Sequence, residues 1–446
     1  TTTFERGSAG QTVEITGQNA SATTSSIGIR SFVDNTVIGN NIAGGVTFSS
    51  VDADGNGAGA QLTAGALVIG QGAGARVSGK GLSLINTTGD LGFATLTIFN
   101  TGNTGLEVNT KGAATTFHLD NTGGTVDTTG GTALFLDPLT MNLTFATVTA
   151  AGGTNGVFVE AGNASGGAGG NALTISTFSV NGSSGAAIRI IDSTGTFSFG
   201  GTTIDNSATA GGGVDLDFST PSTLTLNFTH DLAIATSSGT GLDVQGLGGS
   251  TVTLQALAAA TTSITTTTGR LINVENLRAG AGGINFDTLT ASGLVSGHAI
   301  SLDLDTGAFS GGAVSVLGGA GANAILLGGT AGTITFDSAT VANVATGAAI
   351  ASQFAGTVTF TTVNISASQS GIYTVGDGAV NVNGGTVNVS GGRGVRARRN
   401  GHQHRKQLRR DDHLLRRRHA QHRRRHRCPT AQQHRRHRQF HRQSRH

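Results

Sequence analysis

One short pattern returns along most of the chain: a small residue, an apolar residue, any residue and a second apolar residue. Gly105-Leu106-Glu107-Val108 and Gly156-Val157-Phe158-Val159 are two examples. Copies begin about 22–31 residues apart, a spacing typical of solenoid proteins, in which each repeat is one structural unit. The copies start at Gly81, Gly105, Ala133, Gly156, Ala187, Gly213, Gly241, Arg270 (a looser copy), Ala299, Ala324, Ala349, Gly371 and Gly394.

Two further segments in each repeat alternate apolar and polar residues, as in Thr333-Ile334-Thr335-Phe336 and Val363-Asn364-Ile365. This alternation predicts strands with one buried face, and the Gly, Asn, Ser and Asp between segments favour turns. The sequence therefore predicts an all-β, right-handed parallel β-helix, with three strands per coil and coils of about 22–31 residues. Inward apolar residues should form columns, and we expect one of these to contain Phe145, Phe199, Phe228, Phe286, Phe336 and Phe360.

The composition agrees with strands. Thr, Val, Ile, Ser and Gly dominate, and only Pro138 and Pro221 interrupt the repeats, so long ladders of hydrogen bonds can form. No apolar run reaches the roughly 18 residues of a membrane helix, so no transmembrane segment is expected. The single cysteine, Cys428, lies outside the repeats.

We expect three regions along the chain. Residues 1–45 are less regular and predict an N-terminal coil or a truncated edge, residues 46–395 predict the β-helix, and residues 396–446 predict a disordered tail. The first residues, Thr1-Thr2-Thr3, include neither Met nor a signal peptide, which favours a segment of a longer protein.

The tail differs sharply from the repeats in charge. Residues 393–446 hold 20 of the 28 Lys and Arg residues and 10 of the 13 histidines, but only 2 of the 25 acids. Reading codons that end in C one base early turns Gly, Ala and Val into Arg, Thr into His and Asn into Gln, so we interpret the tail as an out-of-frame extension. The alternatives are a basic arm that binds nucleic acid or an anionic surface, and a His-rich metal site. We expect no nucleic acid partner.

The region from about Val46 to Ala397 resembles the strand-repeat passengers of large bacterial adhesins and autotransporter-type surface proteins. Its periodicity and segments such as Thr357-Val358-Thr359-Phe360 carry the resemblance. The resemblance implies a structural or adhesive segment of a secreted or surface-displayed protein, associated with the outer membrane. The implied partners are host or matrix surface components, glycans, and neighbouring coils of a longer chain.

A catalytic alternative rests on four polar residues. Asp215 and Asp243 should occupy the same outward place in successive coils, with Arg189 one coil earlier and Asp217 two residues beyond Asp215. Such carboxylates could serve a polysaccharide lyase or a glycoside hydrolase of the parallel β-helix type. They are equally explained as ordinary solvent-facing polar positions, and the repeats lack Trp and almost lack Tyr for stacking on sugars. The balance favours a chain without catalytic activity. His118, His230 and His298 stand alone and share no spacing, so no Ser/His/Asp or Cys/His set is predicted.

Two weaker patterns concern a metal ion and ice. Asp52-Ala53-Asp54-Gly55-Asn56-Gly57 matches the first half of a calcium loop, so Asp52, Asp54 and Asn56 are candidate Ca²⁺ ligands. The same residues are common in a simple turn, and no other cofactor is expected. Outward Thr-x-Thr pairs resemble the threonine arrays of ice-binding solenoids, although Asn285 and Ser315 interrupt the column.

Overall fold

A computed structural model describes most of the repeat region. The described residues are 62–70, 76–78, 80–85, 89–110, 117–161, 163–164, 173–245, 250–256, 261–294, 297–318 and 323–398, with three short strands before them. The chain divides into two compact units, Thr1–Arg398 and Arg399–His446. The tail expected from residue 396 therefore lies outside the described residues beyond Arg398.

The described strands are parallel to their partners and form three ladders, one for each strand of a coil. The small-apolar-x-apolar pattern forms the first, named ladder A. It consists of β1 (Glu14–Thr16), β3 (Val46–Ser49), β6 (Leu82–Ile85), β8 (Leu106–Asn109), β11 (Leu134–Asp137), β13 (Val157–Glu160), β16 (Ile188–Ile191), β18 (Val214–Asp217), β21 (Leu242–Gln245), the start of β24 (Ile272–Asn285), β26 (Ile300–Thr306), β29 (Ile325–Gly329), β31 (Ala348–Ser352), β33 (Ser370–Val375) and β36 (Val395–Arg398).

Ladder B follows ladder A in each coil. It consists of the first parts of β4 (Leu62–Ile69) and β7 (Gly89–Thr101), β9 (Phe117–Asn121), the first part of β12 (Thr140–Ala151), β14 (Asn163–Ala164), the first parts of β15 (Leu173–Asn181) and β17 (Thr194–Asn206), β19 (Thr223–Phe228), β22 (Thr251–Ala256), the end of β24, β27 (Ala308–Ser310), the first parts of β30 (Thr333–Ala342) and β32 (Thr357–Ser368), and β34 (Ala379–Val382).

Ladder C completes the coil. It consists of β2 (Thr36–Ile38), the second parts of β4 and β7, β5 (Val77–Ser78), β10 (Thr125–Thr129), the second parts of β12, β15 and β17, β20 (Leu232–Thr236), β23 (Thr262–Thr266), β25 (Thr288–Leu294), β28 (Ala313–Gly318), the second parts of β30 and β32, and β35 (Gly385–Val389).

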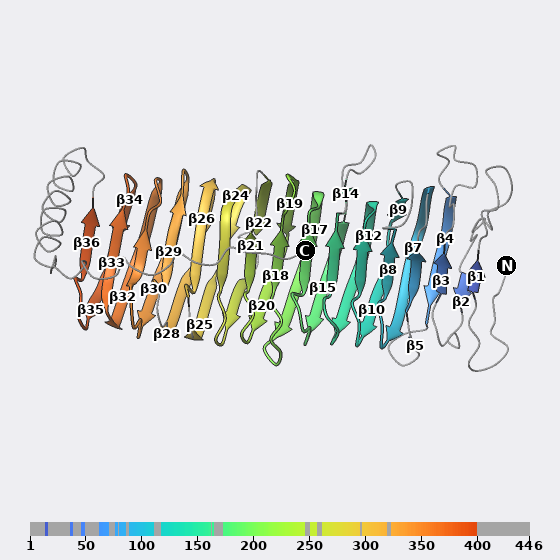
Figure 1. Ribbon diagram of the computed structural model, residues 1–446, viewed down its shortest axis with the longest axis horizontal. Helices are drawn as coiled ribbons and strands as arrows, with labels where there is room; N and C mark the ends of the chain where they lie inside the picture. The colour runs from blue at the N-terminus through green and yellow to red at the C-terminus, as the bar shows by residue number, and fades with distance from the viewer. Residues whose placement is uncertain are drawn as a thin grey trace, which may run out of the picture. The chain divides into compact units, whose positions relative to one another are not determined.

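These ladders make a parallel β-helix, so the predicted all-β fold with three strands per coil is confirmed. Successive coils lie side by side from β3 to β36 (Figure 1). No helix is present among the described residues. Partner residues on adjacent coils are mostly 22 to 31 positions apart, as for His118 and Thr140 or Asn155 and Ala186, and they are 33 to 36 apart where β1 pairs with β3 and β3 with β6. Most of the difference lies at the corners between strands, and part lies at register shifts within the pairings of β24, β25 and β32.

The interior is continuous and apolar because each strand alternates inward and outward residues. In β12 the inward residues Met141, Leu143, Phe145 and Val148 are at most 1% exposed. Most ladder A strands follow a Gly or Ala residue, whereas Leu271 takes that place before β24. At Gly213 this residue must be glycine, because a Cβ atom there would run into the carbonyl oxygen of Gly241 in the next coil. Burial of each inward Val, Leu, Ile or Phe contributes about 1.5–3 kcal/mol.

The expected phenylalanine column is inward but is not one column. Phe145, Phe199 and Phe228 share a register that continues through Ile284 and Phe309. Phe336 and Phe360 pair with each other in a second column, two residues further along the strand than Ile334, which pairs with Phe309. The single-column prediction was therefore wrong. The register shifts where β22 pairs with β24, because β24 has extra residues at this point. The spacing of the sequence repeat does not reveal them.

Buried polar side chains at the end of ladder C close one corner of the coil. Asn206, Thr236 and Thr266 are in register and at most 2% exposed. The Asn206 Nδ2 donates to the Gly212 carbonyl, and the Thr236 and Thr266 hydroxyls donate to the carbonyls of residues 239 and 269 at 2.9 Å. Backbone groups that the turn takes out of the ladder are satisfied in this way.

Both ends of the expected β-helix contain paired strands. Residues 1–45 contain β1, which pairs with β3, and β2, which pairs with β4. At the other end β36 pairs with β33, so ladder A extends to Arg398, past the boundary expected at residue 395.

Candidate functional site

The third residue of the ladder A pattern, which can be of any type and lies between the two apolar residues, forms a row along the outside of the helix. This row is named row A. Its neighbours on either side are inward, so its side chains are directed outward in most coils. Two aromatic residues, one cation and two carboxylates occupy adjoining places within it. In order along the coils, row A contains Ser83, Glu107, Phe135, Phe158, Arg189, Asp215, Asp243, Asn273, Ser301, Leu326, Ala351, Tyr373 and Arg396.

The structure brings three of the four proposed catalytic residues together in row A. Arg189, Asp215 and Asp243 are register partners on β16, β18 and β21. The Arg189 Nε lies 3.4 Å from the Asp215 Oδ2, with side chains 41% and 31% exposed. Asp217 lies on the same outer face, opposite Gln245. These positions match the expected geometry, whereas a catalytic role for them stays a prediction.

The two carboxylates of row A have different surroundings. Burial raises the pKa of Asp215, the nearby Arg189 cation lowers it, and the charges of Asp243 and Asp217 raise it further. Asp243 accepts hydrogen bonds from Gln245 Nε2 at 2.6 Å and from Asn273 Nδ2 at 2.9 Å. A carboxyl group with a raised pKa next to a second carboxyl group is the kind of pair that acid–base catalysis uses.

An aromatic pair stands next to the charged residues, and sequence reasoning missed it. The rings of Phe135 and Phe158 stack with centroids 4.9 Å apart and planes inclined by 7°. Both are half-buried on the outer face, and Phe158 is the register partner of Arg189. The signal was an aromatic residue at the middle position of two successive repeats. This pair offers the flat apolar surface that the lack of Trp had seemed to exclude.

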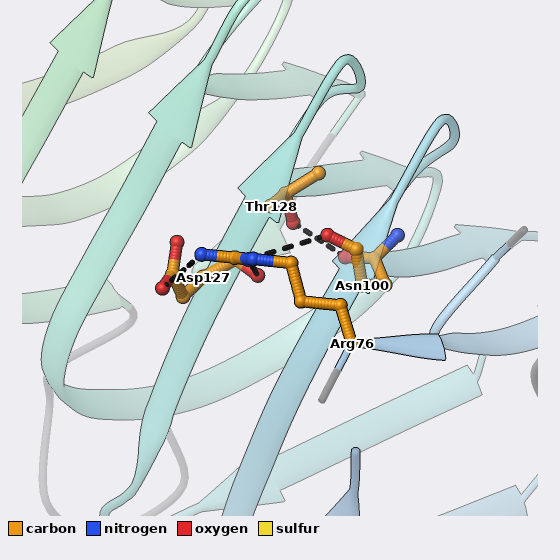
Figure 2. A network of polar contacts seen from close by, with 4 residues as sticks. All are labelled: Arg76, Asn100, Asp127 and Thr128. Carbon is orange, nitrogen blue, oxygen red and sulfur yellow. Dashed lines mark hydrogen bonds and ion pairs between the residues drawn. The ribbon is translucent and has the colours of Figure 1, made fainter. Parts of the chain in front are cut away.

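A polar network in the first described coils, around Arg76, has a structural role. Figure 2 shows Arg76 extended across two coils toward Asp127, with Asn100 and Thr128 beside it. The Arg76 Nη2 lies 2.5 Å from the Asp127 Oδ2, and the Thr128 hydroxyl donates to Asn100 Oδ1 at 2.7 Å. The side chains of Arg76 and Asp127 are only 16% and 19% exposed. Because Arg76 makes these contacts within the chain, the network is a clamp that joins successive coils.

The remaining predicted positions have separate outcomes. Asp52, Asp54 and Asn56 lie outside the described residues, and within those residues no group of three or more His, Cys, Asp or Glu is placed to hold a metal ion. Ser315 is in register with Thr290 and Thr340 in ladder C, whereas Asn285 lies in ladder B. The two interruptions of the threonine array therefore belong to different columns.

The three histidines of the described region are not alike. His230 lies 3.1 Å from the Thr229 hydroxyl, and His298 Nδ1 lies 2.6 Å from the Asn323 carbonyl oxygen. His118 contacts both a hydroxyl and a carboxylate, from Thr140 and Asp120. The expectation that each histidine stands alone was wrong for His118, because its hydroxyl partner lies on the next coil.

The ladders and their outer faces define the class of this protein as a parallel β-solenoid. No family model matches the chain, and no curated protein or solved structure matches it. The class therefore rests on the strand pairing itself. Across the described ranges, no helix is long and apolar enough to cross a membrane.

Proposed function

We propose that this chain is a structural and adhesive β-solenoid segment of a larger protein that is secreted or displayed at the cell surface, in association with the outer membrane. The single observation that supports it is the uninterrupted stack of three parallel ladders around one apolar core. Such a stack is stiff because bending it requires ladder hydrogen bonds to stretch in every coil. Its partners would be host or matrix surface components, glycans and neighbouring coils.

Row A is the surface that we propose for adhesion to glycans. The stacked rings of Phe135 and Phe158 present an apolar face that suits the C–H face of a sugar ring. Arg189, Asp215 and Asp243 continue the same row and can hydrogen-bond to sugar hydroxyls or pair with an acidic sugar. Aromatic and charged groups on one rigid strand face give a partner both contact area and orientation.

Binding of the whole chain to immobilised glycans and matrix components tests this proposal. Phe158→Ala should weaken binding roughly tenfold, equivalent to about 1.4 kcal/mol. Leu326→Ala is a matched control, because Leu326 occupies the same row away from the aromatic pair. Equal binding by wild type and Phe158→Ala, or equal losses in both variants, would contradict the role of the pair.

A polysaccharide-cleaving enzyme is the second candidate, favoured by the raised pKa of Asp215 beside the hydrogen-bonded Asp243. Cleavage of uronans by wild type, but not by Asp215→Asn or Asp243→Asn, would support it. If neither wild type nor Phe158→Ala cleaves uronans, and Phe158→Ala binds glycans more weakly than wild type, the result would favour adhesion alone.

Two further proposals await their own measurements. A weak Ca²⁺ site at Asp52, Asp54 and Asn56 predicts a calorimetric titration signal that disappears in Asp52→Ala/Asp54→Ala. An ice-binding role for the outward threonines predicts thermal hysteresis that Thr290→Lys removes, since Thr290 lies within the ladder C column.

A further inference from the structure

A hydroxyl, an imidazole and a carboxylate meet in sequence on the outer face of ladder B. His118 Nδ1 lies 2.9 Å from the Thr140 Oγ1, and His118 Nε2 lies 2.9 Å from the Asp120 Oδ1. His118 and Asp120 belong to β9, and Thr140 belongs to β12 in the next coil. These are the contacts that join nucleophile, base and orienting group in hydroxyl-dependent hydrolases.

The parallel register creates this group. His118 pairs directly with Thr140, and Asp120 pairs with Asn142. The neighbours of these residues along the two strands are at most 1% exposed, namely Phe117, Leu119, Met141 and Leu143. Strand alternation therefore turns His118, Asp120, Thr140 and Asn142 to the outer face. The side chains of His118 and Asp120 are 23% and 27% exposed, which leaves the group open to a substrate from solvent.

The carboxylate fixes the tautomer of the imidazole. A neutral imidazole has one N–H, and the Asp120 carboxylate can only accept, so the proton belongs on Nε2. The Nδ1 lone pair then accepts the hydrogen bond from the Thr140 hydroxyl. The Phe117 carbonyl oxygen, 3.2 Å from the Thr140 Oγ1, is the more distant of two acceptors for the single proton of that hydroxyl. This arrangement prepares His118 to remove the Thr140 proton.

We propose that Thr140, His118 and Asp120 form a hydrolytic site for small acyl esters. Thr140 Oγ1 attacks the ester carbonyl carbon while its proton passes to His118 Nδ1. The ester C–O bond breaks, the imidazolium protonates the departing alkoxide, and an alcohol leaves. Water, deprotonated by the same imidazole, then attacks the acyl-threonine. The Thr140 oxygen recovers a proton and a carboxylic acid leaves.

The surroundings define the remaining roles and the substrate class. Asp120 is a positioning residue that acts through His118, and Asn142, two residues beyond Thr140 on the same face, supplies a side-chain amide that can donate to the oxyanion. The Thr140 Cβ methyl crowds the nucleophile, so an acetyl group suits the site better than a bulky acyl group. An open strand face also admits an ester carried on a polymer. This activity goes beyond the structural role and stands or falls independently of it.

Acetylation of Thr140 is the decisive measurement. The whole chain is treated with p-nitrophenyl acetate, and peptides are examined by mass spectrometry for an acetyl group on Thr140. The tail holds 10 of the 13 histidines, which hydrolyse this ester unspecifically, so total release of p-nitrophenol is compared between variants and never read alone. We expect an acetyl group on Thr140 in wild type and none there in His118→Gln.

Variants separate catalysis from folding. Thr140→Val, which keeps the shape of the side chain, should remove the part of the rate that depends on the site, and Thr140→Ser should keep or raise it. His118→Gln should lower that part by roughly 10²–10⁴-fold, the usual contribution of a general base. Thr174→Val is the matched control, since Thr174 is an outward threonine of ladder B in the following coil, and its rate should equal that of wild type.

Asp120→Asn tests the positioning role. Its kcat should fall while KM stays near the wild-type value, and its dependence on pH should change because the amide no longer fixes the tautomer. Three results would overturn the proposal: no acetyl group on Thr140 in wild type, an undiminished rate in a folded Thr140→Val, or equal kcat and pH dependence in Asp120→Asn and wild type.

Discussion

The rings of Phe336 and Phe360 stack in consecutive coils, with centroids 4.9 Å apart and planes inclined by 11°. Both side chains are at most 1% exposed and occupy the same register on β30 and β32. Phe309 joins them edge-on to Phe336, at a centroid distance of 6.0 Å. The two phenylalanine columns therefore touch, and the aromatic packing continues across the register shift.

Truncating these rings should cost more than truncating their outward neighbours. Phe336→Ala or Phe360→Ala should destabilise the protein by about 3–5 kcal/mol, because each leaves a cavity in a packed interior. Thr335→Ala or Thr359→Ala should change the free energy of unfolding by less than about 1 kcal/mol. Denaturant unfolding monitored by circular dichroism measures both. Similar losses at inward and outward positions would contradict the assignment of faces.

Two glycines should respond oppositely to replacement by alanine. Gly124 has φ +111°, and a Cβ there would collide with the Leu96 backbone, so Gly124→Ala should destabilise by about 1–3 kcal/mol or more. Gly201 has open space around its missing side chain, so Gly201→Ala should be neutral or stabilise by about 0.4–1 kcal/mol. Melting temperatures compare the two, and an equal loss would show that glycine is needed for another reason.

Asp192 should make stability depend on pH in the acid range. Hydrogen bonds from the Ser219 side chain and from the Ser219 and Thr220 amides outweigh burial and lower the pKa of Asp192 below its ordinary value near 3.8. The folded protein thus prefers the ionised form, so the stabilisation is present above pH 3.8 and is lost as the pH falls through the lowered pKa. Asp192→Asn should be less stable than wild type at neutral pH, and the difference should shrink in acid.

Asp215 should behave in the opposite way. Burial raises its pKa above 3.8, so the folded protein binds this proton more tightly than the unfolded chain. Stability therefore falls as the pH rises from 3.8 through the raised pKa. Asp215→Asn should unfold at a higher denaturant concentration than wild type at neutral pH, and the gain should vanish in acid. A loss of stability in this variant at neutral pH would mean that pairing with Arg189 outweighs burial.

Two deletions distinguish the last strand from the basic segment. Removing Arg399–His446 should leave the melting temperature nearly unchanged, because that sequence has no alternating apolar residues to extend a ladder. Removing Val395–His446 also deletes β36, which pairs with β33 and whose Val395 is the register partner of the buried Ile372. This longer deletion should lower the melting temperature. Salt-sensitive heparin binding that the shorter deletion abolishes would instead support a genuine basic arm.

The sequence predicted the ladders because the strands alternate with period two and most ladder A strands follow a small residue. It could not predict the register between coils of unequal length. Asp215 and Asp243 fall at equal places in the pattern and are register partners. Phe286 also matches its pattern, but it comes after the register shift in β24, so its place in the sequence does not give its place in the stack. Thr140 and His118 lie 22 residues apart in different contexts, so only strand pairing brings them together.

The corners decide where this chain can change length. A residue inserted within a strand would turn every following side chain of that strand to the opposite face, burying polar groups and exposing the apolar columns. A residue inserted at a corner leaves the ladders in register, as coils of 22 and 31 residues within one stack show. Evolution of such a gene is therefore free to lengthen loops on the outside while it preserves the spacing of every row, and new binding loops can be acquired one coil at a time.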